Sequence, residues 1–154
     1  MSANLSDCGQ YRYWLRRGSE ANALTFIMLN PSTADAVADD PTIRRCSGFA
    51  RRNGYSGIVV ANLYAYRATD PAHLWSAEDP VGPQNDYYLA KLARNQGDIV
   101  LAWGGKAKAD RVARLAEIVN HHGSRLLCLG TTKSGAPRHP LFVKNDQPLE
   151  PYQL

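Results

Sequence analysis

The chain lacks any apolar run of the length that a membrane span requires. Its first ten residues, MSANLSDCGQ, also lack the basic and apolar regions of a signal peptide. No internal repeat and no low-complexity segment is present in the sequence. These absences argue against a membrane or repeat protein, and we expect a cytoplasmic protein without a membrane partner.

Cysteine is scarce, and Cys8, Cys46 and Cys128 are widely spaced. They show neither the paired spacing of a zinc site nor a disulfide framework, so we expect reduced cysteines, two of them packed in the core. The acidic residues at positions 35, 39 and 40 would suit Mg²⁺. Helix capping explains Asp40 without metal, and no second carboxylate cluster supports the site, so we expect no metal and no cofactor.

Apolar residues are plentiful: they make up 44% of the 154 residues, which suits one domain over residues 1–154. The net charge is +4, and 13 arginines stand against 5 lysines. Because arginine's planar fork binds phosphates and stacks on bases, the bias favours DNA or a nucleotide as partner. A solvated basic face would give the same count.

Strand patterns alternate with helix patterns along the chain. Near-continuous apolar runs predict buried strands at residues 24–29, 58–63, 98–103 and 125–129, and the aromatic segment 11–17 is typical of an edge strand. Helices are predicted at residues 41–53, 72–76, 84–95 and 106–122. This order predicts an α/β fold, a three-layer α/β/α sandwich with a mostly parallel central sheet.

The helices carry local signals of their own. Asp40 can cap the first helix ahead of Pro41, and Gly54 ends it. An inward stripe on this helix is predicted to comprise Ile43, Cys46, Phe49 and Ala50. On the last helix the predicted inward face comprises Val112, Leu115, Ala116 and Val119.

Each of the four core strands ends in a polar or glycine-bearing turn: NPSTAD, NLYAYR, WGG and GTTKSGAPRHP. The carboxyl ends of parallel strands meet at one edge of a sheet, where open α/β sheets bind their ligands. One crevice is therefore expected to collect Asn30, Asn62, Trp103 and His139.

The segments FIMLNPSTAD, DDPTIRRC, NLYAYRATDP, LAWG and GTTKSGAPRHPL resemble the bacterial domain of unknown function 1643 over nearly the whole chain. A fainter resemblance, in the same order, is to the uracil-DNA glycosylase superfamily. In that superfamily, Asn30-Pro31 is similar to the first motif, and Asn62 is similar to the asparagine that reads the base, with Arg67 a few residues on. Trp103-Gly104 is similar to the end of the third strand, and His139-Pro140 is similar to the last motif.

The resemblance implies a site that cleaves an N-glycosidic bond. Asn30 would hold the attacking water through its amide oxygen, Asn62 would pair with a pyrimidine edge, and His139 would donate to the developing oxyanion. This chain departs from the superfamily in having Leu141 where serine usually follows His-Pro, and Ser32 where some members carry an aromatic residue. It also lacks an obvious wedge residue for scanning duplex DNA.

Further residues are assigned to the same site. The predicted substrate-binding residues are Pro31, Ser32, Thr33, Asn62, Tyr64, Tyr66, Arg67, Trp103 and Gly104, with the tyrosines and Trp103 as candidates for base stacking. The predicted phosphate-binding residues are Arg44, Arg45, Lys133 and Arg138, which with Arg67 would bind single-stranded DNA or nucleotides.

Structural roles remain open for several of these residues. Asn30 could simply cap a turn, and Trp103 could pack in the core. Arg44 and Arg45 could lie on a solvated face of their helix. Three functions follow: a base-excising hydrolase acting on DNA or a nucleotide, a non-catalytic nucleotide or nucleic-acid binding module, or a small-molecule enzyme that uses the crevice. Turnover would exclude the second, and salt-dependent DNA affinity would argue against the third.

Overall fold

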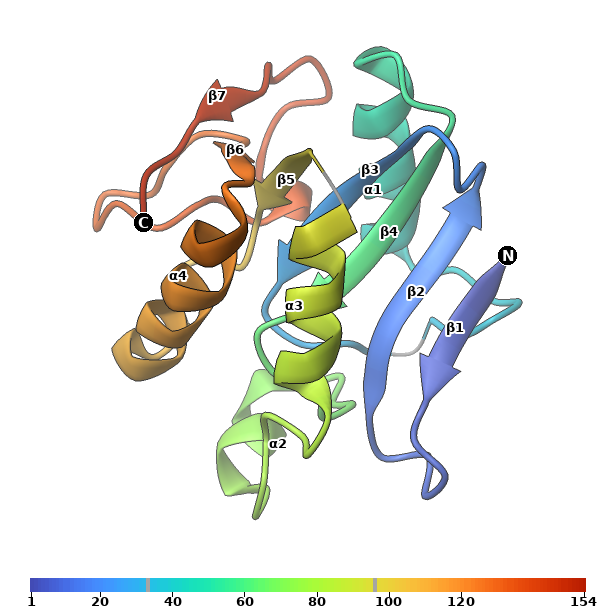
Figure 1. Ribbon diagram of the computed structural model, residues 1–154, viewed down its shortest axis with the longest axis vertical. Coiled ribbons are helices and arrows are strands. Elements are labelled where there is room, and N and C mark those ends of the chain that lie inside the picture. The colour runs from blue at the N-terminus through green and yellow to red at the C-terminus, as the bar shows by residue number, and fades with distance from the viewer. Residues whose placement is uncertain (33, 96) are drawn as a thin grey trace.

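The computed structural model describes residues 1–32, 34–95 and 97–154 (Figure 1). These residues form one seven-stranded sheet in the order β1-β2-β4-β3-β5-β6-β7. The strands are β1 (Ser2–Leu5), β2 (Arg12–Gly18), β3 (Ala23–Met28), β4 (Gly57–Asn62), β5 (Asp98–Leu101), β6 (Arg125–Cys128) and β7 (Glu150–Pro151). The helices are α1 (Pro41–Arg52), α2 (Pro71–Ser76), α3 (Asn85–Asn95), α4 (Ala109–His122) and the 3-10 helix η1 (Pro140–Phe142).

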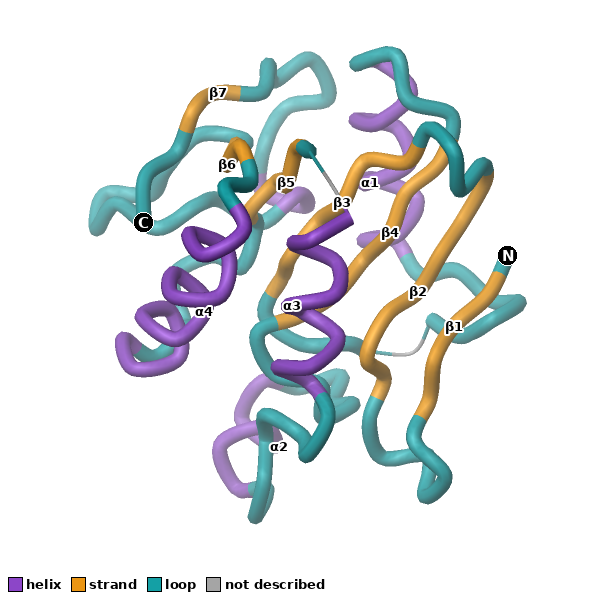
Figure 2. The backbone as a smooth tube through the Cα atoms, viewed as in Figure 1, coloured by secondary structure: helices purple, strands orange, loops and turns teal. Residues whose placement is uncertain are grey.

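The sheet is mixed rather than mostly parallel. Its centre, β4-β3-β5-β6, is parallel, whereas β1, β2 and β7 run antiparallel to their neighbours. The segment predicted as an edge strand is interior, because β1 covers β2; β1 and β7 were not predicted. The chain passes from β3 to one neighbour, β4, and then returns to β5 on the other side (Figure 2). This reversal creates a crevice at the carboxyl ends of β3 and β5, where such sheets bind ligands.

Helices cover both faces of the sheet, as Figure 1 shows. On one face, α3 and α4 pack Leu89, Leu92 and Leu115 against alternate residues of the central strands. On the other face, α1 packs its buried stripe of Ile43, Cys46, Phe49 and Ala50, and these are the four residues that the sequence predicts. The α/β class is confirmed. No helix among the described residues combines the length and apolar character of a membrane span.

Helix α1 begins where the sequence predicts. The Asp40 carboxylate accepts a hydrogen bond from the Ile43 backbone N–H at 2.9 Å, and Pro41 occupies the first helical position. The helix ends as predicted at Gly54, which follows the C-cap Asn53 in the left-handed conformation (φ 85°) and donates its backbone N–H to the Arg51 carbonyl at 3.2 Å. Helix α4 buries Arg111 and Ile118 in addition to Leu115 and Val119, while the predicted Val112 and Ala116 are only half-buried.

An irregularity in β2 changes which way its side chains point. The pairing of β1 with β2 runs Asn4 to Trp14 and then Leu5 to Arg12, so Tyr13 is an extra residue. Tyr13 stacks on Tyr88 of α3, and Trp14 packs on the same face. Arg12 consequently lies on the opposite, α1 face of the sheet, where its guanidinium reaches the backbone of Ala34.

Candidate functional site

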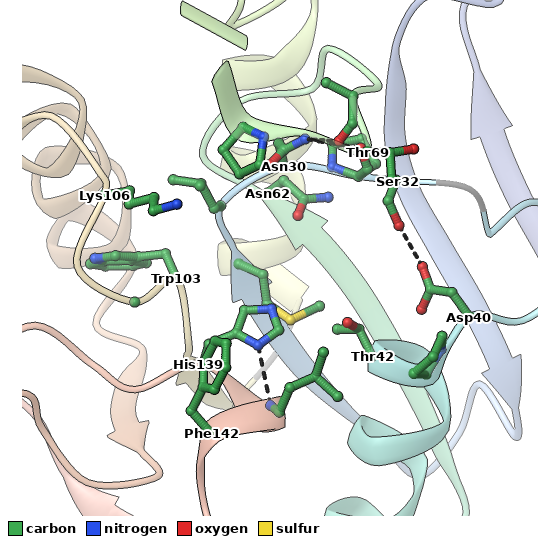
Figure 3. A pocket seen from close by; sticks show the side chains of 18 of the residues that line it. Asn30, Ser32, Asp40, Thr42, Asn62, Thr69, Trp103, Lys106, His139 and Phe142 are labelled. Atoms are coloured by element: carbon green, nitrogen blue, oxygen red, sulfur yellow. Dashed lines mark hydrogen bonds between the residues drawn. The ribbon is translucent and has the colours of Figure 1, made fainter. Parts of the chain in front are cut away.

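A cavity of about 570 Å³ lies at the carboxyl ends of the parallel strands (Figure 3). This volume falls in the range of small-molecule sites. The turns after β3, β5 and β6, the end of β4 and the first turn of α1 form its walls. The four residues expected to meet there, Asn30, Asn62, Trp103 and His139, all line it. We call this cavity the switch-point pocket.

Asn62 is the most unusual residue of the switch-point pocket. Its side chain is 1% exposed, yet neither the amide oxygen nor the amide nitrogen has a hydrogen-bond partner among the described residues. It stands opposite Met28 in the parallel pairing and shares the α1 face of the sheet with Ile58 and Val60. Buried amides are nearly always hydrogen-bonded, so these two groups are available to a molecule that enters the pocket.

The backbone at Asn62 is held rigidly from behind. The buried Asn85 amide donates to the carbonyl oxygens of Asn62 and Leu63, each at 3.0 Å. The Arg111 Nε donates to the Leu63 carbonyl at 2.6 Å, and its guanidinium forms an ion pair with Asp86 at 2.7 Å. These contacts from α3 and α4 fix the end of β4, and so they fix the position of the Asn62 side chain.

Asn30 is anchored by one end of its amide. Its Nδ2 donates to the carbonyl oxygens of Ala68, at 2.7 Å, and Pro31, at 3.1 Å. Because both partners are acceptors, the nitrogen must face them and the amide oxygen must face away from them. That oxygen is the group that the sequence analysis assigns to a water molecule.

His139 precedes η1 and presents one imidazole nitrogen to the switch-point pocket (Figure 3). Its Nδ1 accepts a hydrogen bond from the Leu141 backbone N–H at 3.2 Å, so in the neutral ring the proton lies on Nε2. Burial lowers the pKa of His139 below its usual 6.5, and the nearby Asp40 carboxylate only partly opposes this. At neutral pH the ring is therefore a neutral donor.

Asp40 and Ser32 form a hydrogen-bonded pair on another wall (Figure 3). The Ser32 hydroxyl donates to Asp40 Oδ2 at 2.7 Å, while Oδ1 caps α1. Asp40 was expected only as a cap, and it is also the single acidic residue among the described residues that line the switch-point pocket. Its charge lies at the positive end of the α1 dipole, which stabilises it.

Arg12 is a pocket residue that the sequence analysis missed. Its side chain is 2% exposed and lines the switch-point pocket beside the loop before α1. The Nη1 atom donates to the Ala34 carbonyl at 2.7 Å, and Nε is buried without a described partner. No sequence signal marks Arg12, because strict alternation along β2 would place it with Trp14 and Arg16 on the other face.

The aromatic residues divide between the pocket and the core. Trp103 is 4% exposed and forms part of the pocket wall, whereas Phe142 is 76% exposed at the rim, with its ring centre 5.7 Å from that of His139. Tyr64 is buried outside the pocket, where its hydroxyl accepts from the Lys108 backbone N–H. Tyr66 lies in a neighbouring shallow groove, which shares Ala68, Thr69 and Pro71 with the switch-point pocket.

The remaining predicted residues separate in the same way. Those that line the switch-point pocket are Pro31, Ser32, Gly104 and Arg138. Arg67 lines the shallow groove with Tyr66, and Arg44 and Lys133 are exposed on the surface away from both. Arg45 donates to the carbonyls of Pro140 and Val143 and to Asn145, so it ties α1 to η1. Thr33 lies outside the described residues.

The acidic residues before α1 are distributed among different partners. Asp35 accepts from the backbone N–H groups of Val37 and Ala38, and Asp39 pairs with Arg17 at 2.6 Å. Across the described ranges, no three histidine, cysteine or acidic residues are grouped as a metal site would need. Cys46 and Cys128 are buried and Cys8 is exposed, all three as free thiols, as expected.

Comparison with known proteins gives one match. A family model described as a protein of unknown function (DUF1643) matches residues 12–141, which is most of the chain. No curated protein and no solved structure matches the sequence or the fold.

Proposed function

Since the chain belongs to the DUF1643 family, whose description assigns no function, we propose its activity from the switch-point pocket: hydrolysis of an N-glycosidic bond with release of a nucleobase. The observation that supports this most strongly is the unpaired, buried amide of Asn62. The substrate is a nucleotide, either free or in single-stranded or damaged DNA.

A carboxamide presents one donor beside one acceptor, and a ligand that satisfies both must carry the complementary pair. A pyrimidine offers this pair as a ring carbonyl next to an imide N–H. Because a buried unpaired polar group costs free energy, the site gains both hydrogen bonds only when such a ligand enters. Asn62 therefore favours a uracil-like edge over apolar ligands of the same size.

His139 and Asn30 supply the other two groups that the reaction needs. As the C1′–N bond breaks, its electron pair moves to the base, and the neutral Nε2–H of His139 stabilises the oxyanion that develops. The amide oxygen of Asn30, held in place through Nδ2, orients the water whose oxygen bonds to C1′. The water's proton passes to solvent late in the reaction, because an amide is not a base.

A uracil-DNA-glycosylase-like, three-layer α/β/α architecture forms part of the proposal. Two observations support it: helices cover both faces of the sheet, and the four motif-bearing turns follow the parallel strands in the superfamily's order. Because Ser32 stands where some members of the superfamily carry an aromatic residue, we assign stacking of the base to Trp103, a buried aromatic residue of the pocket wall.

The test measures base release from single- and double-stranded oligonucleotides carrying uracil, other deaminated bases or mismatches, and from free nucleotides. Asn30→Ala should lower kcat more than it weakens binding, because water placement acts on the chemical step. His139→Ala should lower the rate by about 100-fold or more, the usual loss for one oxyanion donor. Asn62→Asp should weaken binding, since a carboxylate repels an acceptor-rich edge.

Matched controls separate these effects from general damage. Asn120→Asp and His121→Ala change the same residue types on the exposed surface of α4, and both should leave base release unchanged. A protein that binds these substrates but releases no base would instead be a non-catalytic nucleotide-binding module.

A further inference from the structure

We propose that the switch-point pocket contains a second subsite, at Arg12, which binds the phosphate of the nucleotide whose base is held at Asn62. The subsite deepens the proposed function by naming the part of the substrate that lies beyond the base. It rests on that function only for the identity of the ligand as a nucleotide, because the anion-binding group can be tested without a base.

Arg12 is buried and only partly paired. Its side chain belongs to a residue that is 2% exposed, and among the described residues its guanidinium makes one hydrogen bond, from Nη1 to the Ala34 carbonyl, while Nε has no partner there. No described carboxylate lies within ion-pair distance of its guanidinium. Buried charges in proteins are normally paired, so a guanidinium that stands on a cavity wall without an ion-pair partner among the described residues favours an anionic ligand.

The acidic residues near Arg12 have other partners. Asp39 is paired with Arg17, and Asp35 accepts two backbone N–H groups. Both oxygens of Asp40 accept hydrogen bonds, and its charge is compensated by the α1 N-terminus. The loop therefore provides no carboxylate in direct contact with Arg12, and Asp40 and Asp35 act on its guanidinium only from beyond ion-pair distance.

The Arg12 guanidinium keeps its charge in the pocket. Burial lowers the pKa of Arg12 to about 10, with Asp40 partly opposing the shift. That pKa is still well above neutral pH, so the guanidinium is charged in the pocket. A phosphate would supply the missing negative charge, and a guanidinium fork matches phosphate geometry better than a single ammonium group does.

Arg12 lies at a distance from Asn62 that suits a nucleotide. The Arg12 backbone N–H donates to the Ala65 carbonyl, so Arg12 stands just beyond the end of β4, three residues past Asn62. Strand geometry puts the two backbones roughly 10 Å apart, with both side chains on the α1 face. A mononucleotide bridges this span with its base at one end and its phosphate at the other.

The experiment measures calorimetric affinities for pseudouridine and pseudouridine 5′-phosphate, whose C-glycosidic bond cannot be hydrolysed. In the unmodified protein the phosphate should strengthen binding roughly 10- to 100-fold, the effect of one or two charge-assisted hydrogen bonds. Arg12→Met should remove that increment and leave pseudouridine affinity unchanged. Arg16→Met, on the other face of the same strand, is the control and should retain the increment.

A base-free probe distinguishes failure of the subsite from failure of the proposed function. Ribose 5-phosphate should bind the unmodified protein and Asn62→Leu equally, and should not bind Arg12→Met. Binding of the base without any phosphate increment would overturn the subsite alone. Phosphate binding without base release would overturn the hydrolase alone.

Two further measurements test the subsite without relying on the Arg12→Met variant. If Arg12→Met does not fold, Arg12→Lys should fold. It should retain less than half of the binding free energy that the phosphate adds, because lysine lacks the guanidinium fork. Equal affinity of the unmodified protein for the nucleoside and its phosphate would overturn the subsite without any variant. Comparison with a single-stranded trinucleotide then shows whether the phosphate comes from a free monoester or from a strand.

Discussion

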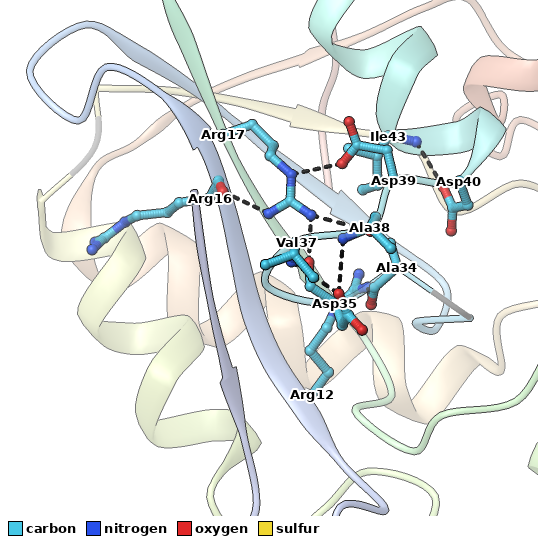
Figure 4. Close-up of polar contacts among 10 residues, drawn as sticks. All are labelled: Arg12, Arg16, Arg17, Ala34, Asp35, Val37, Ala38, Asp39, Asp40 and Ile43. Carbon is cyan, nitrogen blue, oxygen red and sulfur yellow. Dashed lines mark hydrogen bonds and ion pairs between the residues drawn. The ribbon is translucent and has the colours of Figure 1, made fainter.

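Two buried arginines of the same strand, Arg12 and Arg17, have opposite surroundings. Arg17 is 6% exposed and donates to Asp39 and to the carbonyls of Arg16, Asp35 and Ala38 (Figure 4). The Arg12 side chain, at the switch-point pocket, donates to one described residue, Ala34. Each of the three guanidinium nitrogens of Arg17 donates to the protein itself, whereas Arg12 and Asn62 have polar side-chain atoms without a partner among the described residues.

This difference distinguishes polar residues with a structural role, whose groups are satisfied by the protein, from candidate binding residues, whose groups are not. The Arg17 contacts hold the loop that leads into α1, and they need nothing from outside the chain. The unused groups of Arg12 and Asn62 share one cavity, and each lowers stability until a ligand occupies it. Substitution of Arg17 should therefore lower the free energy of unfolding, and substitution of Asn62 should raise it.

The largest effect should come from Arg17→Met. The change leaves Asp39 without its ion-pair partner and the carbonyls of Asp35 and Ala38 without a donor. We expect the free energy of unfolding to fall by about 3 kcal/mol. Urea denaturation would measure this. A loss comparable to that of an exposed arginine, such as Arg44→Met, would contradict the structural role of Arg17.

Asn62→Leu should change stability in the other direction. It replaces an unpaired buried amide with an apolar side chain of similar size, so the free energy of unfolding should rise by about 1 to 2 kcal/mol. The same variant should no longer bind a nucleobase. Denaturation together with calorimetry tests both statements, and a destabilised Asn62→Leu would show that the protein itself satisfies the amide.

Arg12→Met should have a smaller effect on stability than either of these changes. It removes the donor of the Ala34 carbonyl, which costs stability, but it also removes a buried unpaired charge, which restores it. The net change in the free energy of unfolding should stay below about 1 kcal/mol. A loss of stability as large as that of Arg17→Met would show that Arg12, too, has a structural role.

The smallest effect concerns pH and His139. Because burial lowers the folded-state pKa of His139, the unfolded chain binds the proton more readily. Stability from this group is complete above about pH 7.5 and is lost as pH falls through 6.5 towards the folded-state pKa. His139→Gln should reduce the loss of stability between about pH 7.5 and 5. His121→Gln, on the exposed end of α4, is the control.

Much of the fold follows from local sequence. The apolar runs predict β3, β4, β5 and β6 to within two residues, since a strand buried on both faces needs continuous hydrophobicity. The inward stripe of α1 follows from a period of 3.6 residues. The meeting of Asn30, Asn62, Trp103 and His139 follows from parallel strands ending at one edge.

What sequence reasoning missed depends on non-local structure. The register shift at Tyr13 reverses the face of Arg12, and no periodicity predicts a bulge. The short strands β1 and β7 carry too few residues for a pattern. Arg45 resembles a phosphate ligand in sequence, but its partners on η1 lie almost a hundred residues further along the chain.

The switch-point pocket draws its walls from the second strand of the sheet and from the turn before η1, so its lining runs from Arg12 to Phe142. A molecule held there contacts segments that only the completely folded chain brings together. Its binding energy therefore opposes global unfolding rather than the opening of one loop. In hydrogen exchange, a bound nucleotide should slow the most protected amides of β3 and β4 as much as those of the pocket itself.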